Sequence, residues 1–275
     1  MGLKGKVYLA GAGPGDPELV TLKTIRCLQK ADIILVDRLV NQDIIASYAN
    51  PGASVIKVGK QSGKSGSVSQ SEINALIVEY ARQYDVVVRL KGGDVSVFSN
   101  ILDELETLIS HSIDYEIIPG ITAALGASAF AGIPLTARGY ASGLRMLTYH
   151  DENAFTTAQW FDLGNTSDTL VFYMASKKLN ELTTYLILNG MNKDLPVAII
   201  EQATTPFQKV FISSLSDCSD NEKKYLSPSL VIIGKVVELH EKYNWFRANS
   251  KNVLFFDPVS DKSVIHNQEN VGNAS

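Results

Sequence analysis

The chain has 275 residues, of which 45% are hydrophobic and 20% are charged. These values are typical of a folded globular protein and exclude a chain that is disordered throughout, while the length favours about two domains. The formal net charge of −4 provides no global positive field, so general binding to nucleic acid is not expected.

Cysteine usage and hydropathy bear on the compartment. Cys27 and Cys218 lie far apart and form no CxxC pair, which favours a reducing, cytoplasmic setting. Glycines and Pro14 interrupt the N-terminal apolar run that a secretory signal needs, and the longest apolar stretches are far shorter than the roughly 20 residues that span a bilayer. The histidines show no metal-ligand spacing. We therefore expect a cytoplasmic protein with no bound metal and no membrane partner.

The first half of the chain alternates between strands and helices. Every third residue from Leu19 to Leu28 is apolar, which predicts a helix with one buried face. Alternation of strands and helices is typical of a largely parallel sheet covered on both faces. Strands are expected at residues 6–10, 33–36, 54–58, 85–90 and 115–118, and helices at 18–30, 70–84 and 101–110.

The second half repeats this pattern after Pro119, but several strands follow one another closely, which predicts a mixed sheet. Strands are expected at residues 145–148, 169–174, 196–200, 209–212 and 229–233, helices at 122–131 and 177–189, and a loop-rich stretch at 213–227. The predicted fold class is therefore α/β. We expect an N-terminal α/β domain at 1–119, a C-terminal α/β domain at 120–248 and a polar tail at 249–275.

A glycine-rich loop, GAGPGDP at residues 11–17, follows the first strand and precedes a helix. Glycines permit positive φ and close approach of a ligand, and a helix N-terminus favours an anionic group. The loop is similar to a dinucleotide-binding fingerprint, but Pro14 removes one amide that a pyrophosphate would use. The loop alone therefore leaves a dinucleotide site and a plain tight turn both open.

Two further turns follow strands that are expected to be parallel. Asp37 comes 24 residues after Gly13, where it suits either a ribose-binding carboxylate or the N-cap of a helix that starts near Asn41. The sequence KGGD at residues 91–94 ends another strand. Ligands of open α/β sheets bind beyond the carboxyl ends of the strands, so these turns and the glycine-rich loop are expected to form one site.

The stretch from residue 44 to residue 71 holds no Asp or Glu but contains Lys57, Lys60 and Lys64. Its second part, from residue 61, is rich in Ser and Gly. This pattern fits a flexible positive loop that binds an anionic ligand, or a solvated linker with incidental lysines.

These motifs belong to a longer series of segments in which the chain resembles the tetrapyrrole methylases, the class III methylases, and most of all those that act on uroporphyrinogen III. The matching segments are residues 7–19, 37–40, 58–60, 88–94, 118–124, 132–136, 170–174 and 227–234. The resemblance implies two α/β domains with the active site in the cleft between them. It also implies S-adenosyl-L-methionine as the methyl donor, S-adenosyl-L-homocysteine as a product, and a homodimer.

The resemblance assigns roles to individual residues. It implies that the donor contacts Pro14, Gly92, Gly93, Asp94, Val97, Thr122, Ala123, Met174 and Ala203. It gives Asp37 and Lys60 as proton acceptor and proton donor. The anionic tetrapyrrole substrate would be bound by charge-assisted hydrogen bonds from Arg38, Lys64, Arg138 and Arg145.

The implied activity is the transfer of two methyl groups in turn to uroporphyrinogen III, giving precorrin-2 for siroheme or cobalamin biosynthesis. A pyrrole carbon attacks the methyl group and the methylated ring then loses a proton, for which the carboxylate of Asp37 is a suitable base. Two segments depart from the family pattern, because residues 95–102 lack an arginine and three glycines and residues 137–139 lack a histidine and an aspartate. A methylase of a later corrinoid intermediate therefore stays an alternative. A non-catalytic tetrapyrrole-binding protein and, more remotely, a Rossmann-type NAD-binding oxidoreductase also stay open.

Overall fold

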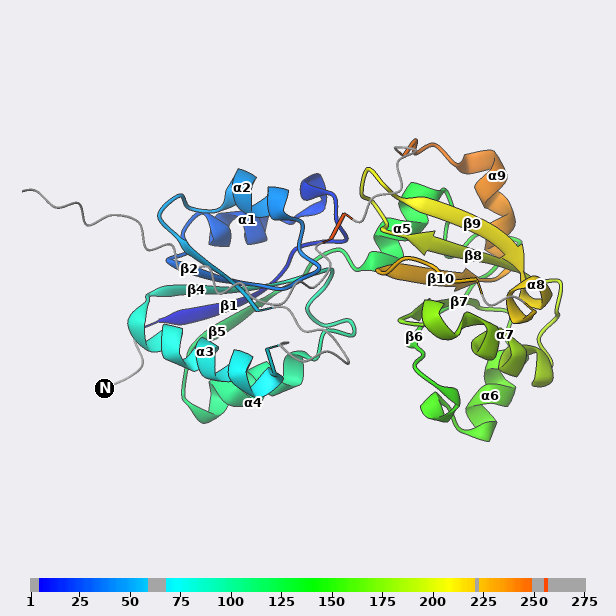
Figure 1. Cartoon of the computed structure of the whole chain (residues 1–275), viewed down its shortest axis with the longest axis horizontal. Helices are drawn as coiled ribbons and strands as arrows, with labels where there is room; N and C mark the ends of the chain where they lie inside the picture. The colour runs from blue at the N-terminus through cyan, green and yellow to red at the C-terminus, as the bar shows by residue number, and fades with distance from the viewer. Residues whose placement is uncertain (1–4, 59–67, 221–222, 249–254, 257–275) are drawn as a thin grey trace, which may run out of the picture.

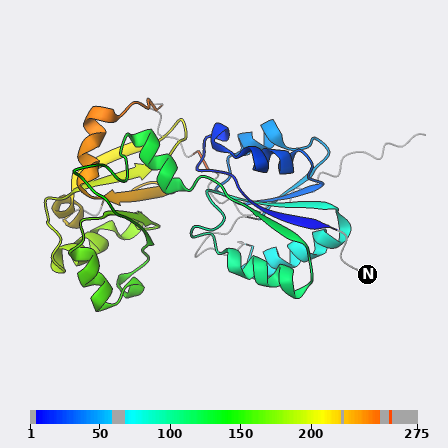
Figure 2. The same cartoon turned by 180° about the vertical axis from the view of Figure 1, so that it is seen from behind.

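A computed structural model describes residues 5–58, 68–220, 223–248 and 255–256 of the chain. It contains two five-stranded sheets, one built from residues 6–118 and the other from residues 144–233. The two sheets, each with its own helices, lie side by side along the long axis of the molecule (Figure 1), and the view from behind shows the same separation (Figure 2). The predicted α/β fold class is confirmed.

All strand pairs of the first sheet are parallel, and the strand order is β3-β2-β4-β1-β5. The strands are β1 (Lys6–Gly11), β2 (Ile33–Val36), β3 (Ser54–Lys57), β4 (Val86–Lys91) and β5 (Tyr115–Ile118). Strand β1 lies between β4 and β5 and is parallel to both. The segments that follow these three strands therefore leave the sheet at the same edge, where ligands of such sheets bind.

Helices cover both faces of the first sheet (Figure 1). One face carries α1 (Leu22–Leu28) and α2 (Gln42–Tyr48), and the other carries α3 (Gln70–Gln83) and α4 (Ile101–Ser110). Successive residues of β1 serve the two cores in turn, since Leu9 packs beneath α3 and α4 and Ala10 packs beneath α1 and α2. The strands are apolar on both sides because both sides are covered.

The first helix differs from its predicted form. A 3-10 turn, η1 (Pro17–Leu19), comes first, residues 20 and 21 are extended, and Thr21 caps α1 by accepting a hydrogen bond from the N–H of Thr24. Helix α1 buries Thr24 and Leu28, whereas Leu22 is 71% exposed. The predicted buried face through every third residue is wrong, because the helix starts four residues later than predicted and faces the sheet differently.

The second sheet has the strand order β6-β7-β10-β8-β9. Strands β6 and β7 pair in parallel and the other pairs are antiparallel, so the predicted mixed sheet is confirmed. The strands are β6 (Leu144–Thr148), β7 (Thr169–Tyr173), β8 (Pro196–Glu201), β9 (Lys209–Ser214) and β10 (Ser229–Ile233).

The helices of this half include several that the sequence pattern did not predict. The longer ones are α5 (Ala123–Ala131), α6 (Thr157–Gly164) and α7 (Leu179–Leu188), of which α6 was missed. The short ones are η2 (Glu152–Ala154), η3 (Ser176–Lys178), α8 (Leu215–Ser219), η4 (Lys235–Leu239) and α9 (His240–Tyr243). Helix α8 lies inside the stretch that was expected to be loop.

The chain passes from the first sheet to the second between β5 and α5. Pro119, where the sequence places the domain boundary, lies in this connection. Helix α5 packs on the core of the second sheet through Ala124 and Ala131, so its N-terminus stands where the two halves meet. Of the tail predicted at 249–275, the structure describes residues 255–256.

Candidate active site

Three backbone segments meet at the edge of the first sheet where β1, β4 and β5 end. Gly11, Gly93 and Gly120 lie on these segments, one on each. A Cβ atom at Gly120 would lie 2.3 Å from the carbonyl oxygen of Gly93, and a Cβ atom at Gly11 would lie 2.7 Å from the main-chain N of Gly120. These distances leave no room for side chains, so the crossing of the segments requires glycine.

The glycine-rich loop uses its own amides in this crossing. The N–H of Gly13 donates to the carbonyl of Gly93 (3.1 Å), and the N–H of Gly93 donates back to Gly13 (2.8 Å). The N–H of Ala12 donates to the carbonyl of Lys91 (2.8 Å). The loop is followed by the three-residue 3-10 turn η1, whose Glu18 N–H already donates to Oδ1 of Asp16 (2.9 Å), and α1 begins only at Leu22. A pyrophosphate would find neither the loop amides nor the N-terminus of an α-helix, which favours the tight-turn interpretation over the dinucleotide one.

Asp94 fastens two of the three segments together. Its Oδ2 accepts a hydrogen bond from the N–H of Gly120 (2.9 Å), and its Oδ1 accepts one from the N–H of Ser96 (2.7 Å). The side chain is buried. Carboxylate hydrogen bonds to main-chain N–H groups are charge-assisted and strong, so Asp94 fixes the shape of the loop after β4.

Tyr173, at the end of β7, joins the second sheet to the same place. Its hydroxyl lies 2.6 Å from Oγ1 of Thr122 and accepts a hydrogen bond from the N–H of Ala124 (3.0 Å). The ring of Phe98 packs against the ring of Tyr173 with centroids 4.8 Å apart. Burial raises the pKa of the Tyr173 phenol, so it stays a neutral hydrogen-bonding group. Tyr173 directly precedes Met174 but was not among the predicted site residues.

A second contact between the halves comes from the loop after β8. Oγ1 of Thr204 accepts a hydrogen bond from the N–H of Asp16 (3.0 Å), and a Cβ atom at Gly126 would lie 2.6 Å from Cγ of Pro14. The structure thus brings together the segments that carry the predicted donor-binding residues. They are Pro14, Gly92, Gly93, Asp94, Val97, Thr122, Ala123, Met174 and Ala203. Met174 is 49% exposed and Ala203 is half-buried, so both leave surface for a ligand.

Asp37 lies on the turn after β2, in register with the end of β4. Its N–H donates to the carbonyl of Leu90 (2.9 Å), and its Oδ1 accepts a hydrogen bond from the N–H of Arg38 (3.0 Å). The N-cap of α2 is Asn41, so the alternative role of Asp37 as a helix cap is wrong. Among the described residues, the buried Nε of Arg38 has no hydrogen-bond partner, which leaves a donor for an anionic ligand beside Asp37.

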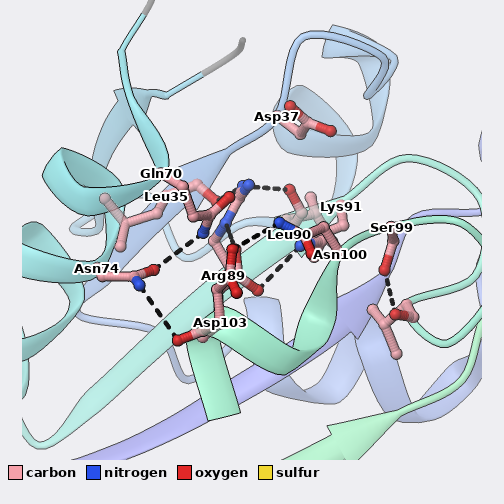
Figure 3. Close-up of polar contacts among 12 residues, drawn as sticks. Leu35, Asp37, Gln70, Asn74, Arg89, Leu90, Lys91, Ser99, Asn100 and Asp103 are labelled. Carbon is pink, nitrogen blue, oxygen red and sulfur yellow. Dashed lines mark hydrogen bonds and ion pairs between the residues drawn. The ribbon is translucent and has the colours of Figure 1, made fainter. Parts of the chain in front are cut away.

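Three charged side chains are buried under this edge of the sheet (Figure 3). Glu104 of α4 accepts from Nε of Arg89 (3.0 Å) through Oε1 and from Nζ of Lys91 (2.9 Å) through Oε2. All three side chains are at most 4% exposed. Burial lowers the pKa of the Lys91 ammonium, and the charge of Glu104 opposes that shift. Two cations face one carboxylate, so the cluster carries an excess of positive charge, and the charge of Asp37 acts on the Lys91 ammonium. Figure 3 shows Asp37 on a neighbouring turn, without a direct contact to Arg89 or Lys91.

Known proteins with similar sequences identify the family. A family model described as Tetrapyrrole (Corrin/Porphyrin) Methylases matches residues 6–218. The chain belongs to the tetrapyrrole methylases. It is 43% identical over 257 residues to a siroheme synthase of Ruthia magnifica subsp. Calyptogena magnifica and 44% identical over 244 residues to one of Acinetobacter baylyi. These matches cover 91% and 88% of this chain but 54% and 53% of the relatives, so the chain spans about half their length.

Solved structures agree with this family. Uroporphyrin-III C-methyl transferase from Thermus thermophilus, complexed with S-adenyl homocysteine, has a TM-score of 0.73 and 34% identity, over 86% of this chain and 94% of that one. A cobalt precorrin-4 methyltransferase has a TM-score of 0.72 and 28% identity, over 84% and 95%. The predicted family and fold are both confirmed.

This tetrapyrrole methylase differs from the family pattern in the loop that joins β4 to α4. Phe98 has φ 51° and Asn100, the N-cap residue of α4, has φ 52°. Neither is glycine, and the family pattern has three glycines in this segment. Phe98 is 45% exposed while it packs on Tyr173, so this loop places an aromatic ring at the rim of the site.

The remaining predicted residues of this methylase are spread more widely. Lys60 and Lys64 lie outside the described residues. Arg138 is exposed beside a hollow of about 610 Å³ lined by residues 136–142 and Ser167. Arg145 forms ion pairs with Asp162 and, at 2.8 Å, with Asp168, so its guanidinium already has carboxylate partners.

In the described part of the chain, no three His, Cys, Asp or Glu side chains are grouped so that they could hold a metal ion. Within the same residues, no helix has the length and apolar character needed to cross a bilayer.

Proposed function

We propose that the protein is an S-adenosyl-L-methionine-dependent C-methyltransferase that converts uroporphyrinogen III to precorrin-2 by two successive methylations. The observation that carries this proposal is the meeting of the glycine-rich loop, the Gly92–Asp94 turn, the N-terminus of α5 and the end of β7 at one place. Family membership and the likeness to a uroporphyrin-III C-methyl transferase support it. We further propose two domains that divide at Pro119 and a cytoplasmic homodimer.

The residues at this place fit a methyl donor. Gly93 has φ 70°, and a Cβ atom there would find its nearest neighbour at 3.8 Å, so the turn is open on one side. Met174 and Ala203, in the second half, leave apolar surface accessible. The donor supplies an electrophilic methyl group when it is bound. The protein contributes a fixed pocket in which the donor and the ring are aligned, and no covalent nucleophile is required.

Asp37 is proposed as the base. It lies beside the end of β4, half-buried, with one carboxylate oxygen held by the N–H of Arg38. Its second oxygen, Oδ2, is the one proposed to take the proton that the methylated ring must lose. Lys60 is proposed as the proton donor.

Positive charge near Asp37 suits a substrate with several carboxylates. The guanidinium of Arg38, whose buried Nε has no hydrogen-bond partner within the described residues, is proposed to form a charge-assisted hydrogen bond, and the buried Arg89, Lys91 and Glu104 cluster adds a net positive field. Lys64, Arg138 and Arg145 are proposed as further substrate contacts. For Arg145 this would require exchange of its present carboxylate partners.

The decisive experiment is product analysis. Purified protein is incubated with the methyl donor and enzymatically generated uroporphyrinogen III, and the product is identified by mass spectrometry. We expect a dimethylated product that is absent when the donor is omitted. Unchanged substrate, with a positive control enzyme active in the same mixture, would refute the proposal.

A later corrinoid intermediate is the second candidate substrate. The altered segment at residues 99–102 favours it, because the loop that carries this segment also places Phe98 at the rim of the site, and a changed rim can select a changed ring. Competition of the two substrates in one reaction separates the candidates. Preferential methylation of the corrinoid would replace the leading assignment, and preferential methylation of uroporphyrinogen III would retain it.

A further inference from the structure

The loop after β8 holds two residues in a costly backbone conformation. Gln202 has φ 49° and Thr204 has φ 64°, and neither is glycine. The left-handed region costs roughly 1–2 kcal/mol per residue for most side chains. Such conformations persist only where surrounding contacts impose them, and they cluster at functional sites. Ala203, proposed above as a donor contact, lies between the two residues.

One side of this loop is held by the first half of the molecule. Thr204 is buried, its Oγ1 accepts a hydrogen bond from the N–H of Asp16 (3.0 Å), and its own N–H donates to Oε1 of Gln208 (2.8 Å). The carbonyl of Ala203 lies 3.1 Å from the position of a Cβ atom at Gly15. The loop is therefore pressed against the glycine-rich loop at this end.

The other side is held by a segment near the C-terminus. Gln202 is 1% exposed, and its side-chain Oε1 accepts a hydrogen bond from the main-chain N–H of Phe255 (2.6 Å). The ring of Phe255 faces the ring of Phe207 with centroids 6.1 Å apart, and Phe256 is 6% exposed. Both views show residues 255–256, at the red end of the colour scale, between the two halves beside this loop (Figure 1, Figure 2).

The main-chain N–H and carbonyl of Gln202 also have hydrogen-bond partners. Its N–H donates to the carbonyl of Pro228 (2.8 Å), and its carbonyl accepts from the N–H (3.2 Å) and the hydroxyl (2.8 Å) of Thr205. Gln202 therefore cannot follow a change in one contact without disturbing the turn that carries Ala203. Gln202 therefore connects Phe255 to the turn that carries Ala203 through a continuous set of hydrogen bonds.

We propose that Gln202 is a positioning residue for the methyl donor, and that Phe255 and Phe256 hold it in place so that this C-terminal segment sets the affinity for the donor. The inference rests on the proposed function, because it takes Ala203 as a donor contact. It implies a coupling that runs both ways. If the segment favours donor binding, donor binding must stabilise the docked segment by the same factor.

Two substitutions at one position separate the hydrogen bond from the ring. Phe255→Pro removes the N–H that Gln202 accepts, whereas Phe255→Ala keeps the N–H and removes the ring. Phe255→Pro leaves the buried Oε1 of Gln202 without its donor, and an unpaired buried acceptor carries a free-energy cost. We therefore expect calorimetry to show that Phe255→Pro binds S-adenosyl-L-homocysteine about tenfold more weakly. Phe255→Ala is expected to weaken this binding less. In turnover, Phe255→Pro should raise the KM for the donor and leave both the kcat and the KM for the tetrapyrrole unchanged.

The reverse coupling gives a test on the unmodified protein. Chymotrypsin cleaves after aromatic residues, so the rate of cleavage at Phe255 and Phe256 reports how often the segment leaves its site. We expect S-adenosyl-L-homocysteine to slow this cleavage. This readout does not depend on the folding of any variant, and a merely structural role of the segment would leave the rate insensitive to the ligand.

The outcomes separate this inference from the proposed function. If the wild-type protein does not bind S-adenosyl-L-homocysteine, the proposed function fails and the inference with it. If the wild type binds but Phe255→Pro binds equally well, or cleavage is insensitive to the ligand, only the inference is overturned. An equal loss of affinity in Phe255→Pro and Phe255→Ala would overturn the role of Gln202 as the group through which the segment acts.

Discussion

The two halves of the molecule build the site in different ways. In the first half, the glycine-rich loop and the turn directly after β4 depend on glycine, with Gly13 at φ 77° and Gly93 at φ 70°, while Phe98 and Asn100 further along the loop are left-handed without being glycine. The second sheet reaches the same left-handed region with larger residues, Met174 at φ 61°, Gln202 at φ 49° and Thr204 at φ 64°. Glycine reaches these angles at little steric cost, whereas the other residues must be held there by their surroundings.

This difference assigns different duties to the halves. The first half provides a rigid edge made of backbone, with the proposed base Asp37 on it. The second half provides a strained surface that is pinned by side-chain contacts such as those of Tyr173 and Thr204. Substitution of Asp37 should therefore act on the chemistry, substitutions at the glycine crossing on folding, and substitution of Tyr173 on donor affinity.

The largest effect is expected at Asp37. Loss of a base lowers a rate by about 10²–10⁴-fold, so Asp37→Ala should reduce kcat by that factor while the affinity for S-adenosyl-L-homocysteine stays unchanged. Asp43→Ala, on the exposed surface of α2, is the matched control and should leave both values as they are. A large loss of ligand affinity with normal turnover at saturation would instead make Asp37 a donor contact.

The buried cluster of Arg89, Lys91 and Glu104 tests whether buried ion pairs, in addition to backbone contacts, stabilise the first half. Glu104→Leu leaves Arg89 and Lys91 buried without their carboxylate, which should lower the free energy of unfolding by about 3–5 kcal/mol in urea titration. Glu106→Leu, at an exposed position of the same helix, should change it little. Equal stability of the two variants would contradict the role of Glu104.

The glycine crossing predicts a position-specific cost. Gly120→Ala introduces a Cβ atom 2.3 Å from a carbonyl oxygen, so the free energy of unfolding should fall by about 3 kcal/mol. Gly139→Ala has positive φ but no neighbour within 4 Å of the new atom, so it should cost about 1 kcal/mol. If the two variants lost the same stability, backbone conformation rather than close approach would explain both.

Tyr173 probes the second half. Tyr173→Phe removes the hydroxyl that meets Thr122 and Ala124, and should weaken binding of S-adenosyl-L-homocysteine about tenfold, with a smaller effect on kcat. Tyr185→Phe is the control, because Tyr185 lies on α7 and stacks on Trp160 in the hydrophobic core of the second half, and this variant should bind the ligand normally. A loss confined to kcat would place Tyr173 among the groups that act on the chemistry.

The smallest effect is expected from the carboxylate of Glu116, on β5 of the first sheet. Hydrogen bonds from Lys23 and Lys6 lower the pKa of Glu116 from 4.5 to about 2. A carboxyl group whose pKa is lower in the folded state stabilises the fold above pH 4.5, and that contribution is lost as the pH falls towards 2. Glu116→Gln should therefore flatten the decline of Tm over this range, by about 1–2 °C. A slope equal to that of the wild type would show that the pair contributes nothing.

Local patterns were sufficient for most of the fold and for the glycine half of the site. Within the described residues, the predicted strands match all ten that the structure has, and the buried ones were the plainest because they need continuous apolar sequence. The start and face of α1 were mistaken because the cap at Thr21 competes with an apolar pattern that begins earlier. Short helices such as α8 were missed because their few residues carry little periodicity.

Other parts of the site depend on contacts that no local pattern records. The glycines in the sequence indicate where the loops of the first sheet lie, and Asp37 directly follows the clearly apolar strand at residues 33–36. Tyr173 and Gln202 matter because residues 50 or so positions away along the chain meet them, at Thr122 and at Phe255. The one available signal was Arg89 inside an apolar strand, which indicates a buried partner but does not identify Glu104.

The buried cluster of Arg89, Lys91 and Glu104 has a consequence for how ionic strength affects substrate capture. Charges exposed to solvent are screened within about 10 Å at 0.1 M salt, whereas buried charges are screened much less. The exposed Arg138 should therefore lose its attraction for an anionic substrate as salt is added. The excess positive charge of the cluster, at most 4% exposed, persists, so a salt-resistant share of the substrate affinity should originate beneath the sheet.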